Sequence, residues 1–379
     1  MPLYGAEKAD LVLKLVFIVP LTLGINVLES CYLAVRRGLV LKDYLIVAIL
    51  RTFLTCLSPR QIVAVSPSTE ATFSSWWTQT QAFSANQNSA LRATPVTEVV
   101  ADGARIHWIQ PPSHRSEVVL FFHGGGYNAP LSTGHMNWCA AIVRHSLKAN
   151  RTVAVAILEY GLTPDNRYPL QLRQARNALE HLLKSGITPE NVIIGGDSAG
   201  GHLALSLLSH LLHPHPQCEL LSLQAPLAGA FLISPWVTDK TESESFRWNA
   251  RIDMLSSNLV RRSTGDFVAS SELEAERVRG HGWAMPMQAG PGWWEGLGGV
   301  VTSLYITAGE QELFRDHIVE FGNHLRTELS LVGGEMPAVQ LHVDPGEAHD
   351  HILVSCLQGQ MDTPSMKRLV RWMKRAWNT

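Results

Sequence analysis

Short apolar runs recur through most of the chain and are separated by segments with a different periodicity. The runs are of strand length and lie at 118–122, 152–158, 192–197, 229–234, 303–308 and 339–343. Between them lie longer segments of helical spacing, of which 170–184 is the clearest. Strands that alternate with helices build a mostly parallel sheet that is covered on both faces. The pattern therefore predicts an α/β fold with a central sheet flanked by helices.

A different pattern precedes these strands. Residues 96–100 and 105–109 alternate between apolar and polar positions around Ala101-Asp102-Gly103, and Pro111-Pro112 follows. Two alternating runs joined by a short turn predict an antiparallel hairpin. We expect this hairpin to begin a catalytic domain that spans residues 95–379.

The first sixty residues are the most apolar part of the chain. Residues 11–28 are interrupted by Lys14, Pro20 and Asn26 and are close to the roughly 20 residues that a membrane span requires. Residues 39–57 place Leu50, Phe53 and other apolar side chains on one helical face. Two interpretations stay open for 1–60: a membrane anchor with an interfacial helix, or helices packed over the active site as a lid. We expect membrane association through 11–57, with the endoplasmic reticulum as the candidate compartment and the cytoplasm as the alternative.

Two further segments do not follow the alternation of strands and helices. Residues 61–94 are expected to connect the apolar start to the catalytic domain and to contribute to the lid, and the polar part at 66–88, which includes Trp76-Trp77, predicts a surface helix or loop. Residues 237–299 carry charged helical pieces, tryptophans and methionines. An insertion here would lie above the strand ends, where ligands bind in open α/β sheets. We expect it to form a lid, with its tryptophans and methionines either lining an apolar pocket or packing in the lid core.

Composition narrows the possible functions. The chain has 379 residues, 46% hydrophobic and 17% charged, which is enough for one large domain and an accessory segment. A net charge of −2 means that the chain has no excess of basic residues, which nucleic-acid binding usually requires. The five cysteines are scattered and odd in number, so they indicate neither a disulfide framework nor a zinc site. His213-Pro214-His215-Pro216 is interpreted as a connection rather than a metal site, and the oligomeric state stays open.

The sequence around Ser198 carries the strongest chemical signal. The apolar run that starts at Val192 ends in Gly195-Gly196, Ser198 follows between small residues, and helical periodicity begins at Ala199. Gly196-x-Ser198-x-Gly200 is the nucleophile-elbow pattern, in which a strained turn lifts the serine hydroxyl above the sheet. Glycines two residues before and after the serine are expected because a Cβ at either position would strike neighbouring backbone.

A glycine run follows another buried strand. Val118 to Phe122 leads directly into His123-Gly124-Gly125-Gly126. Backbone amides in such a run can face a reacting carbonyl because no side chains block the approach. A phosphate-binding loop is the alternative, but no Gly-Lys-Ser/Thr follows. We therefore expect an oxyanion hole.

Taken together, His123-Gly124-Gly125-Gly126, Gly196-Asp197-Ser198-Ala199-Gly200 and Ser234-Pro235-Trp236 resemble the motifs of α/β-hydrolases of the hormone-sensitive-lipase type. The resemblance covers residues 95 to 377. Trp283-Ala284-Met285-Pro286 and Pro291-Gly292-Trp293-Trp294 are further similar to fungal steryl acetyl hydrolases. The resemblance implies an α/β-hydrolase fold with a helical lid and a serine esterase that needs no cofactor or metal.

In this fold the catalytic residues follow the order serine, acid, histidine. The family pattern places the acid four residues before the Asp of an Arg-Asp pair, which corresponds to Glu312, where the family usually has Asp; Asp316 and Glu310 stay open. The family pattern also places the histidine on the loop after the last strand, which corresponds to His349. His351 and His342 are its competitors.

These positions imply a mechanism and a substrate class. The resemblance assigns Ser198 as nucleophile, His349 as base and Glu312 as the orienting acid, with an oxyanion hole formed by amides of Gly124, Gly125 and Ala199; Gly126 is either a donor or shapes the turn. We expect cleavage of small-molecule esters, with acetyl or short acyl groups on an apolar alcohol such as a sterol or secondary metabolite. A non-catalytic small-molecule receptor, or acyl transfer or a non-hydrolytic rearrangement on the same fold, stays open.

Overall fold

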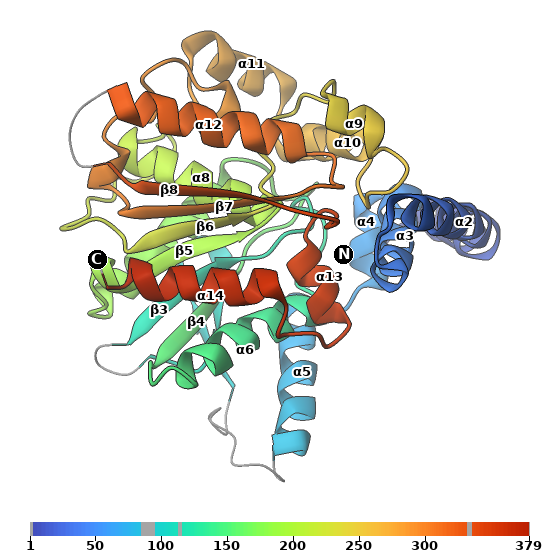
Figure 1. Ribbon diagram of the computed structural model, residues 1–379, viewed down its shortest axis with the longest axis horizontal. Coiled ribbons are helices and arrows are strands. Elements are labelled where there is room, and N and C mark those ends of the chain that lie inside the picture. Colours follow the sequence, from blue (N-terminus) through green and yellow to red (C-terminus); the bar gives the residue numbers. More distant parts are fainter. Residues whose placement is uncertain (1–2, 85–94, 113–115, 332–335, 379) are drawn as a thin grey trace.

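The computed structural model describes residues 3–84, 95–112, 116–331 and 336–378, and over these ranges the chain forms one eight-stranded sheet in the order β1-β2-β4-β3-β5-β6-β7-β8 (Figure 1). β1 and β2 are antiparallel, as are β2 and β4, and the other neighbours are parallel. The strands are β1 (Val96–Val99), β2 (Arg105–Ile109), β3 (Glu117–Phe122), β4 (Val153–Glu159), β5 (Val192–Asp197), β6 (Gly229–Ile233), β7 (Ser303–Gly309) and β8 (Ala338–Asp344). The predicted parallel sheet and antiparallel hairpin are both confirmed.

Helices cover both faces of the sheet. Figure 1 shows α8 and α12 on one side of the strands and α6 and α14 on the other. Alternate residues of β3 divide between two core clusters accordingly, with Leu120 and Phe122 in one and Phe121 in the other. The bounds are α6 (Thr133–Leu147), α7 (Leu170–Lys184), α8 (Ala199–Leu212), α12 (Arg315–Leu331), α13 (His351–Leu357) and α14 (Pro364–Ala376). The α/β fold with flanking helices is confirmed.

α6, which follows the glycine run, begins at Thr133. Ser132 precedes it in extended conformation, and its backbone N–H donates to Nδ1 of His135 over 3.1 Å. This reciprocal cap satisfies a donor that the first helical turn leaves without a partner. His135 takes the place of the glutamate or glutamine that usually closes such a cap, so the sequence does not show the common capping motif.

The apolar N-terminal part of the chain forms one long helix, and after a turn a second helix packs against it. α1 (Gly5–Leu13), the π-helical η1 (Lys14–Ile18) and α2 (Val19–Arg37) are continuous, and left-handed Gly38 ends them before α3 (Leu41–Cys56). Buried Asn26, Ser30 and Ala34 follow one another at intervals of four along α2. Asn26 Nδ2 donates to Thr52 Oγ1 of α3 over 2.9 Å. We call α2 and α3 the N-terminal hairpin; Figure 1 shows it beside one end of the sheet.

The connecting segment contains α4 (Pro59–Val65) and α5 (Thr69–Ser84), and its residues 85–94 lie outside the described residues. Trp76 and Trp77 of α5 are buried in the same hydrophobic cluster as Trp138 and other side chains of α6. Trp76 Nε1 donates to Oδ1 of Asn137 over 2.9 Å. Of the two alternatives for 66–88, a helix or a loop, the described part forms a helix, and its tryptophans pack against the sheet domain.

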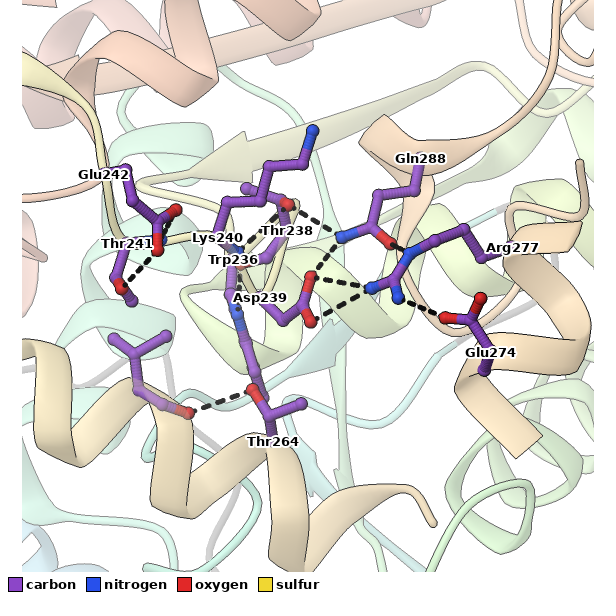
Figure 2. Close-up of polar contacts among 11 residues, drawn as sticks. Trp236, Thr238, Asp239, Lys240, Thr241, Glu242, Thr264, Glu274, Arg277 and Gln288 are labelled. Carbon is purple, nitrogen blue, oxygen red and sulfur yellow. Dashed lines mark hydrogen bonds and ion pairs between the residues drawn. The ribbon is translucent and has the colours of Figure 1, made fainter. Parts of the chain in front are cut away.

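The insertion at 237–299 lies between β6 and β7. It contains α9 (Glu244–Trp248), α10 (Ser257–Phe267), α11 (Ser270–Arg279) and two short 3-10 turns, Pro286–Gln288 and Leu297–Gly299. Figure 2 shows how polar contacts close it on itself: Arg277 pairs with Asp239 over 3.2 Å and with Glu274 over 2.6 Å, and Gln288 contacts Asp239 as well. The beginning of the insertion is therefore tied to α11 and to the turn at 286–288.

Candidate active site

Ser198 stands at a strained turn between β5 and α8. Its φ of 48° and ψ of −114° lie outside the regions that a non-glycine residue usually adopts. A Cβ on Gly196 or Gly200 would lie 1.8 or 1.9 Å from the carbonyl oxygen of Phe122, so only glycine fits at either position. The Ser198 N–H donates to the Ile233 carbonyl over 2.9 Å. These contacts hold the turn in its strained conformation and explain the glycines of the motif.

The glycine run lies directly against the elbow. A Cβ on Gly124 would lie 2.1 Å from Oδ2 of Asp197, while Gly125 and Gly126 have φ of 101° and 60°. All three glycines line the same cavity as Ser198. Ala199 is buried and does not line it, but as the first residue of α8 its amide has no partner within the helix. Amides from both segments are thus available beside the serine.

His349 is the histidine that reaches Ser198. Its Nε2 lies 2.9 Å from Ser198 Oγ, and its side chain is 1% exposed. The ring edge of Phe314 packs on the imidazole at a centroid distance of 5.3 Å. Neither competing histidine approaches the serine, because His351 Nε2 lies 3.8 Å from Asp43 and His342 packs against Tyr305. The loop after β8 therefore presents His349 to the nucleophile position.

Glu312 is the predicted acid that faces His349. Its Oε2 lies 3.7 Å from His349 Nδ1, beyond hydrogen-bond length. Oε2 accepts hydrogen bonds from Ser234 Oγ over 2.5 Å and from the Gly309 N–H over 3.1 Å. Neither Glu312 Oε1 nor His349 Nδ1 has a hydrogen-bond partner. Such contacts are often long without substrate and shorten in the reacting complex.

The other two carboxylates point elsewhere. Asp316 Oδ2 accepts from the Ser245 N–H over 2.6 Å, and Glu310 Oε2 accepts from the Gly346 N–H over 2.9 Å. The first contact joins α12 to α9 of the insertion, and the second joins the loops that follow β7 and β8. Of the three predicted candidates, Glu312 is therefore the one that the fold brings to His349.

A second carboxylate, which sequence reasoning missed, contacts the same histidine. Oδ2 of Asp350 lies 3.2 Å from His349 Nε2, and its Oδ1 has no hydrogen-bond partner. Burial opposes a charged His349, but the carboxylates of Asp350 and Glu312 outweigh it and hold the pKa of His349 well above its usual value. Burial also raises the pKa of Asp350 to about 7. The one signal for Asp350 in the sequence is its position as a charged residue immediately after the histidine.

A cavity of about 200 Å³ opens above Ser198. Its apolar wall comes from three sources: α3, the insertion, and the segments near His349. These wall residues are Leu50, Leu54, Trp236, Met254, Leu255, Leu259, Val260, Phe314, Leu353 and Leu357. Two side chains of the N-terminal hairpin, Leu50 and Leu54, thus face the same space as the nucleophile.

The two alternatives for the tryptophans and methionines of the insertion, a pocket wall or core packing, apply to different residues, and exposed Trp248 fits neither. Met254 lines the cavity, but Trp283, Trp293 and Trp294 do not; they are buried elsewhere, and Trp248 is 69% exposed. Trp283 Nε1 donates to the His213 carbonyl over 2.6 Å, which ties the insertion to the end of α8. These large side chains fill the core of the insertion, which leaves the pocket wall to smaller aliphatic residues.

His213 and His215 are both engaged in contacts with tryptophans of the insertion. His213 Nε2 donates to the Trp293 carbonyl over 2.8 Å, and His215 packs edge-on against Trp283. Within the described part of the chain, no three His, Cys, Asp or Glu side chains are grouped so as to hold a metal ion.

The chain belongs to the α/β hydrolase fold family, whose sequence pattern matches residues 119–353, more than half of its length. An esterase of Acinetobacter venetianus is 29% identical over 169 residues, which are 45% of this chain and 50% of that protein. An acetyl-hydrolase of Streptomyces hygroscopicus is 29% identical over 183 residues, 47% of this chain and 56% of that protein. Arylacetamide deacetylase of Oryctolagus cuniculus is 28% identical over 194 residues, 46% and 44% of the two chains. The chain spans about half the length of these curated relatives.

Solved structures share the fold. An esterase from the bacterial hormone-sensitive lipase family superposes with a TM-score of 0.60 at 20% identity, over 89% of this chain and 98% of that one. Carboxyl esterase 2 of Tuber melanosporum gives a TM-score of 0.58 at 22% identity, over 77% and 88%. At these identities the likeness concerns the fold alone.

Proposed function

We propose that this protein is a serine hydrolase that cleaves carboxylic esters through an acyl-enzyme. The observation that carries the proposal is the 2.9 Å contact between Ser198 Oγ and His349 Nε2 at the glycine-lined floor of an apolar cavity. A serine is a weak nucleophile at neutral pH, so it needs a base within hydrogen-bond reach. Similarity to proteins named esterase, acetyl-hydrolase and deacetylase supports the same reaction.

In the proposed mechanism Ser198 Oγ attacks the ester carbonyl while His349 Nε2 takes its proton. Glu312 orients the imidazole and stabilises its charged form. Amides of Gly124, Gly125 and Ala199 hold the tetrahedral oxyanion, and Gly126 shapes the turn or adds a fourth donor. His349 then passes the proton to the leaving alcohol, and water attacks the acyl-enzyme with the histidine again as base. This chemistry uses the chain's own side chains and amides.

The size and polarity of the cavity support a small apolar substrate. Pockets for drug-sized ligands measure roughly 300–1,000 Å³, whereas this cavity measures about 200 Å³. An acetyl or short acyl group fits that space. A bulky alcohol such as a sterol would extend past Leu50 and Leu54 of α3. We therefore propose short-acyl esters of apolar alcohols as the substrate class.

Parallel assays of the purified wild type and Ser198→Ala on p-nitrophenyl acetate, butyrate and octanoate test this function. We expect the wild type to hydrolyse acetate and butyrate faster than octanoate, and the variant to be inactive on all three. A folded wild type that hydrolyses none of them would contradict the proposal and favour a receptor. Turnover that appears only when an acceptor alcohol is added would indicate acyl transfer.

We further propose that the N-terminal helices bind a lipid surface. Within the described ranges one helix, 5–37, is long and apolar enough to cross a membrane, and its length is about 50 Å. Its outer side carries an exposed apolar stripe, formed by Phe17, Leu21, Leu28, Tyr32 and Val35 with exposed fractions of 59–74%. Such a stripe is typical of helices that lie in the membrane interface.

The inner side of the same helix favours a position along the membrane over a spanning one. Asn26 is bonded to Thr52, and Lys14 Nζ lies 2.8 Å from Asp10 and 3.2 Å from Gln61 Oε1 of α4. A span would lose the contacts with Thr52 and Gln61 and would leave polar groups in hydrocarbon.

Sedimentation with phosphatidylcholine vesicles tests this binding, with Phe17→Ser/Leu21→Ser/Leu28→Ser as the variant. We expect wild type to pellet with the vesicles and the triple variant to stay in the supernatant. Leu220→Ser, an exposed leucine far from this stripe in the sequence, is the control. Equal pelleting of wild type and triple variant would contradict the proposal, and protection from added protease of the residues on one side of the helix only would indicate a span.

A further inference from the structure

The turn that carries Glu312 is held by the insertion through its backbone. Asn249, which is 2% exposed, donates from Nδ2 to the Glu312 carbonyl over 3.0 Å and to the Glu310 carbonyl over 3.2 Å. Asp253 Oδ2 accepts from the N–H of Leu313 over 2.6 Å. The peptide unit on the C-terminal side of Glu312 therefore has its carbonyl and its N–H bonded to two buried side chains of the insertion.

These two residues are in turn linked to the N-terminal hairpin, Asn249 through its side chain and Asp253 through its backbone carbonyl. Arg37, the last residue of α2, donates from Nη1 to Asn249 Oδ1 over 2.9 Å and to Gln311 Oε1 over 2.5 Å. Its Nη2 donates to the Trp248 carbonyl over 2.7 Å. Arg51 of α3 donates to the Asp253 carbonyl over 2.8 Å. Each insertion residue that bonds the turn is thus contacted by one arginine of the hairpin.

The position of this turn controls a contact that is only just out of reach. Glu312 Oε2 and His349 Nδ1 are 3.7 Å apart; Nδ1 has no hydrogen-bond partner, whereas Oε2 is held by Ser234 Oγ and the Gly309 N–H. A backbone shift of less than 1 Å would either form the hydrogen bond or prevent it, because such bonds weaken steeply beyond about 3.2 Å. A small change in the geometry of a catalytic group can cost about a hundredfold in rate.

We propose that Arg37 and Asn249 are positioning residues for Glu312, so that the N-terminal hairpin is part of the catalytic apparatus as well as a wall of the cavity. The inference rests on the proposed esterase function. Arg37 fixes the Asn249 amide and the Gln311 side chain together, and Asn249 fixes the Glu312 backbone. Loss of either link lets the turn relax away from His349.

The test compares Arg37→Ala with Arg36→Ala in the full-length chain. Arg36 is the adjacent arginine, and its Nη1 contacts the hydroxyl of Tyr32 on the same helix. For p-nitrophenyl acetate we expect Arg37→Ala to lower kcat about tenfold with KM within twofold, while Arg36→Ala matches wild type. The effects of Arg37→Ala and Glu312→Gln on kcat should not add, because substitutions of coupled residues are not additive. The double variant Arg37→Ala/Glu312→Gln should therefore have the same kcat as Glu312→Gln alone. Unchanged kcat in Arg37→Ala, or a full further loss in the double variant, would overturn the proposal.

Two additional measurements keep the inference independent of folding and of the proposed function. Arg37→Lys keeps the charge but cannot reach three acceptors at once, so it serves if Arg37→Ala does not fold; it should also lower kcat. NMR titration of the His349 imidazole needs no substrate. We expect its pKa to fall in Arg37→Ala, because Glu312 stabilises the charged ring less well. An unchanged His349 pKa in Arg37→Ala would refute the positioning role, even if the wild type hydrolyses no ester. If the wild type is inactive but the His349 pKa falls in Arg37→Ala, the esterase function is refuted and the positioning role stands.

Discussion

Asp350 Oδ2 lies 3.2 Å from Nε2 of His349, the same ring nitrogen that approaches Ser198 Oγ. The carboxylate occupies this place because Asp350 adopts a left-handed conformation with φ of 52° and its N–H donates to Ser234 Oγ over 3.2 Å. His349 thus lies between two carboxylates, Glu312 on the Nδ1 side and Asp350 on the Nε2 side. A charged imidazole is stabilised from both sides.

This arrangement predicts an unusual pH dependence. The neutral imidazole is the base, and the two carboxylates hold the pKa of His349 above its usual 6.5. Activity should therefore be lost as the pH falls through a midpoint above 6.5. Asp350→Asn removes one carboxylate, so the midpoint should move to lower pH and activity should persist further into the acid range. The measurement is kcat/KM for p-nitrophenyl acetate from pH 5 to 9.

Asp316→Asn serves as the control for this profile, because Asp316 pairs with Arg315 and the Ser245 N–H rather than with His349. Its midpoint should equal that of the wild type. A midpoint that is the same in Asp350→Asn and wild type would show that Asp350 does not act on the histidine.

The assignment of the acid leads to a second prediction. Glu312→Gln should lower kcat about 10²- to 10⁴-fold, because the amide cannot stabilise the imidazolium, as in serine hydrolases that lose their acid. Glu310→Gln, two residues earlier on the same turn, should stay within threefold of wild type. The check is kcat for p-nitrophenyl acetate for both variants, and a larger loss in Glu310→Gln would reassign the acid.

The cavity wall from α3 leads to a third prediction. Leu54→Ala should enlarge the acyl site and raise the octanoate to acetate ratio of kcat/KM about three- to tenfold, at about 0.8 kcal/mol for each newly buried methylene. Phe53→Ala is the matched control, since Phe53 precedes Leu54 on α3, is 41% exposed and does not line the cavity. The same ratio in both variants would place the acyl chain elsewhere.

A fourth prediction concerns stability. Gly196→Ala should destabilise the protein by about 3 kcal/mol or more, since the new Cβ would meet the Phe122 carbonyl oxygen and overpacking of rigid surroundings is costly. Gly265→Ala in α10, where nothing lies within 4 Å of the added Cβ, should be neutral or slightly stabilising. Urea unfolding of both variants checks this, and equal midpoints would mean that the elbow relaxes at no cost.

The sequence predicted the fold and singled out Ser198 as the proposed nucleophile, because both inferences depend on local patterns. The run from Val192 to Gly200 encodes a strand, a strained turn and a helix within a few residues, and the glycines follow from clashes with one neighbouring strand. His349 and Glu312 could be proposed because they follow the ends of recognisable strands. The parallel sheet fixes where those ends meet.

Other features depend on contacts between segments far apart in the chain. Nothing local to Leu54 indicates that it faces Ser198, and nothing local to Asn249 indicates that it bonds the carbonyl of Glu312. Asp350 differs, since it adjoins the histidine, but its contact with Nε2 requires a left-handed backbone that the residue type alone does not specify. The sequence therefore indicated the proposed catalytic residues but not the contacts that other parts of the chain make with them.

Leu50 and Leu54 belong to a helix that precedes the first strand of the sheet, so under the proposed esterase function substrate preference is partly encoded outside residues 119–353, which match the family. Changes in α3 can therefore retune which esters are accepted while the reacting residues stay the same. A shortened protein that lacks this helix would retain the nucleophile, yet it would expose the acyl site to water and lose part of its selectivity. The apolar start of the chain should accordingly be treated as a specificity module.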